Sequence, residues 1–165
     1  MVIFKWDDKE STTGNGKFLS VIEGTDCEFY HGDPPPHDRA YFYSQLKAVN
    51  NYFQSVSYGN FGIDLVQSNI YPLASESYEL QQPMSYYYPY DEQESSEDRL
   101  VELFKESIEI AYSMDGIDYD IYDIIVVFHA GIGQDFALPF LDPTPEDIPS
   151  TFIDSEMINN SIGQD

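Results

Sequence analysis

Basic residues and cysteine are scarce in this sequence. Lysine and arginine number 7 against 30 aspartates and glutamates, which gives a formal net charge of -23. Proteins that bind nucleic acid neutralise phosphates with lysine and arginine, so this balance argues against a nucleic-acid partner. It disfavours an anionic membrane surface for the same reason. Cys27 is the only cysteine, which excludes an intrachain disulfide and a cysteine-based zinc site.

Long apolar runs are also missing. No stretch of about 18 consecutive apolar residues occurs, so no membrane-spanning helix is predicted. The first residues, Met-Val-Ile-Phe-Lys-Trp, are typical of a short strand and lack the basic head and long apolar middle of a signal peptide. The sequence as given therefore has no predicted export or anchoring signal. The alternative is that Met1 is not the natural start and the chain is a piece of a longer protein.

Several catalytic motifs are absent. The sequence contains no Gly-X-Ser-X-Gly run of a serine hydrolase and no His-Glu-X-X-His of a zinc hydrolase. Gly131-Ile-Gly133 follows an apolar run, but Phe136 stands where a nucleotide-binding fingerprint needs its third glycine. The histidines His31, His37 and His129 lie far apart in sequence. Nucleotide binding and self-contained zinc or serine catalysis are therefore not predicted.

The acidic residues are unevenly distributed. Residues 91–165 hold 19 acids and 2 bases, whereas residues 1–90 hold 11 acids and 5 bases. One interpretation is a solubilising surface suited to a salty or extracellular setting. The other is calcium binding, because Asp115, Asp118 and Asp120 are hard oxygen ligands close together in sequence. They lack the twelve-residue spacing of an EF-hand loop, so an acidic turn remains the alternative.

Length and composition predict a folded chain. Hydrophobic residues make up 42% of its 165 residues, and 14 tyrosines and 11 phenylalanines give an aromatic content that disordered acidic tails lack. A chain of this length buries about 70% of its unfolded surface in one core. We therefore expect one domain over residues 1–165.

Apolar periodicity predicts two main helices. Phe42, Leu46, Val49, Phe53 and Val56 recur at helical spacing before Gly59, and Leu100, Leu103, Phe104, Ile108 and Ala111 form a second stripe that ends near Tyr112. The predicted strands span residues 2–6, 61–65, 71–80 and 121–128, with a short edge strand at 151–154. Residues 81–90, with two prolines and four tyrosines, are predicted to be either a loop over the core or a tyrosine ligand platform.

The segment from Ile121 to Phe128 is the strongest strand signal in the chain. Its residues are mostly β-branched or aromatic, as in a strand buried on both faces, so we expect it to be the central strand. His129 follows at its carboxyl end, before the turn Gly131-Ile-Gly133, where open α/β sheets bind ligands. His129 is interpreted as a histidine held by hydrogen bonds, with a metal or acid–base role as the alternative.

The order of elements predicts the fold class. Strand, helix, strand, strand, helix, strand and edge strand together indicate an α+β or α/β fold, with a mixed β-sheet and two main helices packed on it.

Three segments give the chain a resemblance to a known family. These segments are Pro34-Pro-Pro-His-Asp-Arg-Ala-Tyr-Phe42, Asn51-Tyr-Phe-Gln-Ser-Val-Ser-Tyr-Gly59 and Tyr122-Asp-Ile-Ile-Val-Val-Phe-His-Ala-Gly-Ile-Gly-Gln-Asp135. Together they resemble the immune inhibitor A family of secreted zinc metallopeptidases, and more closely its large multidomain bacterial members. The resemblance extends from about Val2 to Asp154.

The resemblance implies a zincin-like catalytic domain whose amino-terminal mixed sheet lies above the cleft. The helix that carries His-Glu-X-X-His would come later, and this chain does not contain it. We therefore expect the truncated front half of a secreted peptidase, inactive by itself, from a parent that uses zinc to cleave a peptide or protein substrate. His129, Gly131, Gly133, Thr151 and Phe152 are the expected cleft-adjacent residues. The rival hypothesis is a non-catalytic acidic module that binds calcium or a protein partner.

Overall fold

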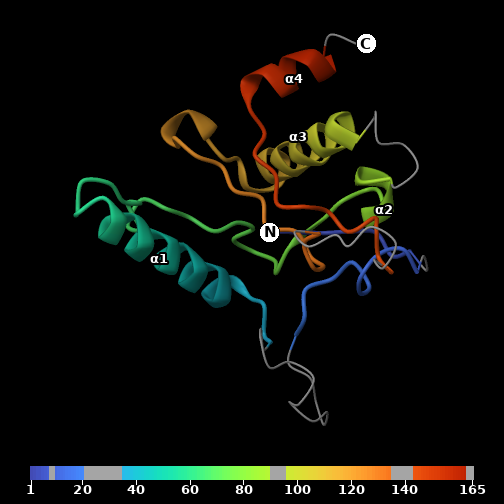
Figure 1. The fold of residues 1–165 in the computed structure, drawn as a ribbon, viewed down its shortest axis with the longest axis horizontal. Helices are drawn as coiled ribbons and strands as arrows, with labels where there is room; N and C mark the ends of the chain where they lie inside the picture. The colour runs from blue at the N-terminus through green and yellow to red at the C-terminus, as the bar shows by residue number, and fades with distance from the viewer. Residues whose placement is uncertain (8–9, 21–34, 90–95, 135–142, 163–165) are drawn as a thin grey trace. The chain divides into compact units, whose positions relative to one another are not determined.

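The computed structural model describes residues 1–7, 10–20, 35–89, 96–134 and 143–162 (Figure 1). The fold is α+β, because the described residues form one small parallel sheet and four α-helices. The chain divides into two compact units, one comprising Met1–Lys17 with Ser77–Asp165 and the other comprising Phe18–Glu76. None of the helices in the described part of the chain is long and apolar enough to cross a membrane.

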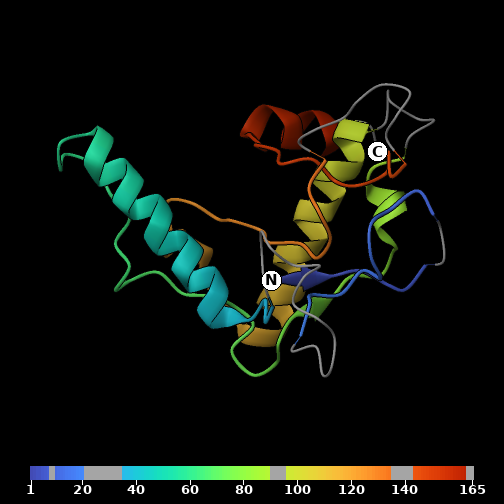
Figure 2. The same cartoon turned by 60° about the horizontal axis from the view of Figure 1, so that its bottom comes forward.

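The sheet of the first unit has β1 at its centre. Strand β1 (Val2–Ile3) pairs in parallel with β2 (Tyr78–Glu79), with Val2 opposite Tyr78 (Figure 2). On its other edge Val2 forms a parallel bridge with His129. Val2 N donates to Phe128 O at 2.8 Å, and Ala130 N donates to Val2 O at 3.0 Å. The predicted first strand is therefore confirmed in part, and it is the middle of three adjacent segments.

The core of this unit is built from apolar side chains on and beside these segments. Phe4 is 1% exposed, and its ring centroid lies 5.8 Å from that of Tyr87. Val2, Leu80 and Ala130 are also buried. Val2 and Phe4 lie on the buried side of the chain, as expected from the period of a strand.

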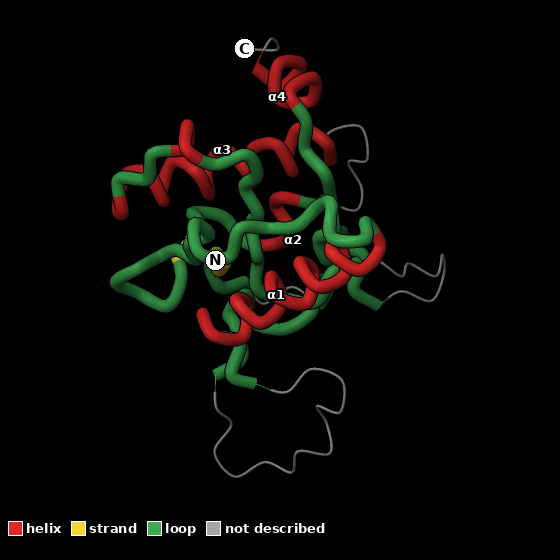
Figure 3. Tube along the Cα trace, turned by 90° about the vertical axis from the view of Figure 1, so that its left-hand side faces the viewer, coloured by secondary structure: helices red, strands yellow, loops and turns green. Residues whose placement is uncertain are grey.

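Three helices complete the first unit. Helix α3 (Ser96–Asp115) contacts β2, α2 (Met84–Tyr87) and α4 (Ser155–Ile162) (Figure 3). Leu100, Leu103 and Ala111 from the predicted stripe are buried, which confirms the second predicted helix. The four-residue α2 buries Met84 and Tyr87, so residues 81–89 of the tyrosine-rich segment form a loop and a short helix against the core.

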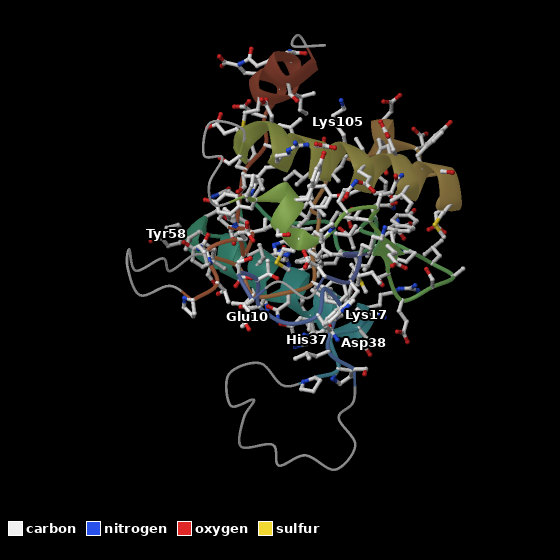
Figure 4. The ribbon with its side chains drawn as sticks, turned by 90° about the vertical axis from the view of Figure 1, so that its right-hand side faces the viewer. Glu10, Lys17, His37, Asp38, Tyr58 and Lys105 are labelled. Atoms are coloured by element: carbon white, nitrogen blue, oxygen red, sulfur yellow. The ribbon has the colours of Figure 1, made fainter. Side chains whose placement is uncertain are left out.

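The second unit contains α1 (Arg39–Val56), which confirms the first predicted helix. Asp38 is its N-cap, because the carboxylate accepts a hydrogen bond from Tyr41 N at 2.9 Å. At the other end Gly59 has a φ of 79°, and its N–H donates to Gln54 O at 2.8 Å. Figure 4 labels Asp38 and Tyr58 just outside the two ends of α1.

The predicted central strand is wrong. Residues 122–128 are extended or bent without a ladder, and Tyr119–Ile121 forms a short 3-10 helix. Ile124 is 70% exposed and Val126 is 54% exposed, so the run is not buried on both faces. The register explains this result. His129 lies opposite Val2, so β1 offers no residue opposite the segment before Phe128.

The predicted strand at residues 61–65 is also wrong, because side-chain oxygens accept hydrogen bonds from backbone N–H groups in and beside this segment. Asn50 Oδ1 accepts from Ile63 N at 2.8 Å, and Asp64 Oδ1 accepts from Val66 N at 3.0 Å. Such bonds replace a strand ladder with a turn. Of the strand predicted at residues 71–80, only Tyr78–Glu79 forms.

The predicted edge strand at residues 151–154 is wrong as well. These residues carry no ladder and lead into α4, a helix that the polar sequence after Ser155 did not predict. Asp154 Oδ1 accepts from Glu156 N and from Met157 N, each at 2.9 Å. The Asp154 carboxylate therefore caps the helix, which leaves the residues before it as its approach segment.

Candidate functional site

His129 lies at the bridge with β1. Its Nδ1 is 3.0 Å from Ala130 O, which is a hydrogen bond in the tautomer that carries the proton on Nδ1. The imidazole ring is tilted against Phe4, with 5.9 Å between the centroids. The side chain is partly buried. The contacts of His129 are thus a hydrogen bond and ring packing, and both interpretations of its role stay predictions.

Gly131 makes a close approach to the core. Its φ is 102°, a conformation that favours glycine, and a Cβ there would collide with Met84 Cε. Met84 is 3% exposed and its Cε is the end of a flexible side chain, so a Cβ at residue 131 would require the methionine to change its conformation. Gly133 follows two residues later and is partly buried, and Gln134 N then donates to Ile148 O at 3.2 Å. The structure brings His129, Gly131 and Gly133 into one turn beside the sheet.

A buried carboxylate lies in the same unit. Asp147 is 4% exposed and accepts two hydrogen bonds from Thr13, at 2.6 Å from the backbone N and at 2.6 Å from Oγ1. Its neighbour Glu146 accepts from the Ser11 hydroxyl, and Glu146 N donates to Ser11 O at 3.0 Å. These bonds tie the loop after β1 to residues 144–148. The sequence did not predict this cluster, because its partners are more than 130 residues apart.

Tyrosine hydroxyls on α2 donate to carboxylates of α3. Tyr87 is fully buried, and its hydroxyl donates to Glu106. Burial raises the pKa of Tyr87 well above its usual range, and the hydrogen bond and negative charge of Glu106 raise it further. Tyr86 donates to Glu102 at 2.9 Å, and its pKa is also raised, first by burial and then by Glu102.

Arg99 completes this cluster. Its Nη1 lies 2.9 Å from Glu102 Oε2, and its guanidinium carbon lies 4.1 Å from the centroid of the Tyr86 ring. The hydroxyls of Tyr86 and Tyr87 are thus used within the fold. These hydrogen bonds agree with the interpretation of the tyrosine-rich segment as a loop over the core rather than as a ligand platform.

Two of the three candidate calcium ligands, Asp115 and Asp118, have other roles in the fold. Asp115 accepts a hydrogen bond from the Tyr78 hydroxyl. Asp118 caps the 3-10 helix by accepting from Asp120 N at 3.2 Å. Among the described residues, no three His, Cys, Asp or Glu side chains are arranged to hold a metal ion. Calcium binding by these aspartates stays a prediction.

Thr151 and Phe152 lie in the approach to α4. Thr151 Oγ1 donates to Pro149 O at 3.1 Å, and Phe152 is 84% exposed. The Phe152 ring therefore has little packing, and the structure does not bring it into the turn that holds His129.

An acidic cleft lies between α3 and α4. It has a volume of roughly 210 Å³, and its lining residues are Glu97, Asp98, Val101, Asp154, Glu156, Met157 and Asn160. Four of these seven side chains are carboxylates, and this surface was not predicted because α4 was not. The N-cap at Asp154 was the available sequence signal.

Comparison with protein-family models, with curated proteins and with solved structures gave no match for this chain.

Proposed function

We propose that this chain is the amino-terminal portion of the catalytic domain of a secreted zinc metallopeptidase similar to immune inhibitor A. The zinc ligands and the general base would lie on polypeptide that follows Asp165, and the parent protein would cleave peptide bonds. The observation that carries the proposal is the bridge between His129 and Val2. One of the three segments that carry the resemblance thus pairs with the amino-terminal strand, and the proposal assigns both to the amino-terminal sheet of a zincin-like domain.

The uncovered apolar side chains also support the proposal. Ile124 is 70% exposed and Val126 is 54% exposed, and both belong to the extended run before the bridge. In the described part of the chain, the backbone of residues 123–127 makes no hydrogen bonds. Exposed apolar side chains next to unpaired backbone are typical of a strand that other protein covers. In the proposed parent, later strands of the catalytic domain cover it.

The described residues do not by themselves fit a zinc site. They contain no set of three side chains placed as metal ligands, whereas a catalytic zinc needs about three protein ligands and an open position. We therefore assign no step of hydrolysis to this chain. In the proposal, Gly131 and Met84 fix the turn that carries His129, and the sheet supports the cleft.

An activity comparison tests the proposal. The 165-residue chain, a longer chain that continues through the downstream coding sequence, and the longer chain with the motif glutamate changed to glutamine are assayed on casein with added zinc. The proposal predicts hydrolysis by the longer chain alone, with loss of hydrolysis on chelation. A longer chain that carries His-Glu-X-X-His and is properly folded but inactive contradicts it. So does hydrolysis by the 165-residue chain.

The acidic cleft favours a second candidate, a non-catalytic module that binds calcium or a cationic protein partner. Glu97, Asp98 and Glu156 line this cleft together with Asp154. A ligand bound only by the folded state raises the melting temperature. The candidate predicts that millimolar calcium or a lysine-rich peptide raises the melting temperature of the chain. It also predicts that the double variant Glu97→Gln, Asp98→Asn shows no such increase. An unchanged melting temperature with both ligands removes this candidate.

A further inference from the structure

The loop from Ser11 to Lys17 carries a chemical feature that the proposed function does not use. Asn15 is followed by Gly16, and none of the other six asparagines of the chain precedes a glycine. Asn15 is exposed. Glycine has no side chain to hinder attack by its own backbone nitrogen on the preceding carboxamide. Asparagine is among the thermolabile residues for this reason.

The geometry of the loop favours that attack. Asn15 Oδ1 accepts a hydrogen bond from Lys17 N at 3.1 Å, so the carboxamide folds back along the chain over Gly16. The same bond polarises the carboxamide carbonyl and makes its carbon more electrophilic. In the described part of the chain, Gly16 N–H donates no hydrogen bond. The attacking nitrogen is therefore not held in another interaction.

We propose that Asn15 is a site of non-enzymatic deamidation and isoaspartate formation. Gly16 N loses its proton to hydroxide and forms a bond to Asn15 Cγ. The Cγ–Nδ2 bond then breaks, and the carboxamide nitrogen takes a proton from water and leaves as ammonia, which regenerates hydroxide. A five-membered cyclic imide results. Water then adds to one of its two carbonyl carbons, and the ring opens to aspartate or to isoaspartate. The reaction consumes water and releases ammonia, and it needs no oxidant or reductant.

Isoaspartate at residue 15 affects the core because it displaces the backbone of Gly16, which is hydrogen-bonded to Phe4. Gly16 O accepts a hydrogen bond from Phe4 N at 2.8 Å, and Gly16 has a φ of 74° with Phe4 close against it. Isoaspartate adds a methylene to the backbone between residues 15 and 16, which displaces this carbonyl. Phe4 packs against both Tyr87 and His129. The product therefore loosens β1 next to the candidate site, whereas plain aspartate leaves the backbone length unchanged.

The test follows the whole chain during incubation at 37 °C and neutral pH. Peptide mapping and enzymatic methylation of isoaspartate should detect the product at residue 15 before any other asparagine, with oxygen-18 incorporated from labelled water. The folded chain should react at least as fast as the same chain in urea. Asn15→Gln should abolish the signal, because its attack would close a six-membered ring, and Asn60→Gln should retain it.

Amide hydrogen exchange at Phe4 tests the link to the core. Exchange should rise in the isoaspartate fraction and stay near that of the unmodified chain in Asn15→Asp, which carries the charge without the extra methylene. Slower deamidation of Asn15 in the folded chain than in urea, or earlier deamidation of another asparagine, overturns the assignment of Asn15 as the site. Equal exchange at Phe4 in the isoaspartate fraction and the unmodified chain overturns its effect on β1.

Discussion

The hydrogen bond between Tyr87 and Glu106 provides a quantitative test of the packing between α2 and α3. Tyr87→Phe removes the hydroxyl and keeps the ring that contacts Phe4. A hydrogen bond to a charged group contributes about 1.5–3 kcal/mol. Glu106 is only partly buried, so we expect a loss near the lower end of that range. In a chain of this length such a loss lowers the melting temperature by about 3–6 °C.

The dependence of folding stability on alkaline pH is a second measure of the same hydrogen bond. The usual tyrosine pKa is about 10, and burial and Glu106 raise that of Tyr87 in the folded chain. The contribution of Tyr87 to stability is therefore fully present below pH 10. It is lost as the pH rises from about 10 through the higher folded pKa, because the unfolded state releases its proton first. Tyr87→Phe should lose less stability over this interval than the unmodified chain.

Urea unfolding between pH 7 and 11 measures both effects. Tyr112→Phe is the control, because Tyr112 lies on α3 and is 64% exposed, so its change should stay within about 0.5 kcal/mol. Equal stability of Tyr87→Phe and Tyr112→Phe at neutral pH would refute the energetic role of the bond. Identical alkaline profiles for Tyr87→Phe and the unmodified chain would refute the raised pKa.

Three further substitutions test other parts of the fold. In thermal unfolding, Gly131→Ala should destabilise the chain more than Gly14→Ala does. Both glycines have a positive φ, a conformation that costs alanine roughly 1–2 kcal/mol. Only Gly131 faces Met84, so only its substitution adds a steric clash. Equal losses would argue against the clash. Asp147→Asn should cost about 1.5–3 kcal/mol in urea unfolding, because it removes a charged acceptor from two hydrogen bonds; an unchanged midpoint would contradict that role. Asp38→Ala should weaken the start of α1 by about 0.5–2 kcal/mol and reduce the helical circular dichroism signal; an unchanged signal would show that the cap is dispensable.

Local signals predicted the helices better than the sheet. The apolar stripes of α1 and α3 repeat within a few residues, so the sequence contains most of the information that a helix needs. A strand needs a partner elsewhere in the chain. Ile124 and Val126 are typical strand residues, yet the register of the bridge leaves them beyond the end of β1. Periodicity carries no information about the length of the neighbouring strand.

The candidate site was predictable only in part. The apolar run before His129 predicted a strand that does not form, and the structure shows only a bridge between His129 and Val2. The buried Asp147 and its partner Thr13 were not predictable, because they are distant in sequence and form no recognised motif. The acidic cleft depends on α4, whose N-cap Asp154 is a signal that sequence reasoning can use.

The zinc content of a longer polypeptide tests the central proposal most directly. The chain would be expressed together with the coding sequence that follows Asp165, purified, and analysed for bound metal before and after dialysis against a chelator. The account predicts His-Glu-X-X-His in that downstream sequence and stoichiometric zinc in the purified protein, with the zinc removed by the chelator. A stop codon directly after Asp165, or a folded longer protein that binds no zinc, would contradict the assignment to a zinc metallopeptidase.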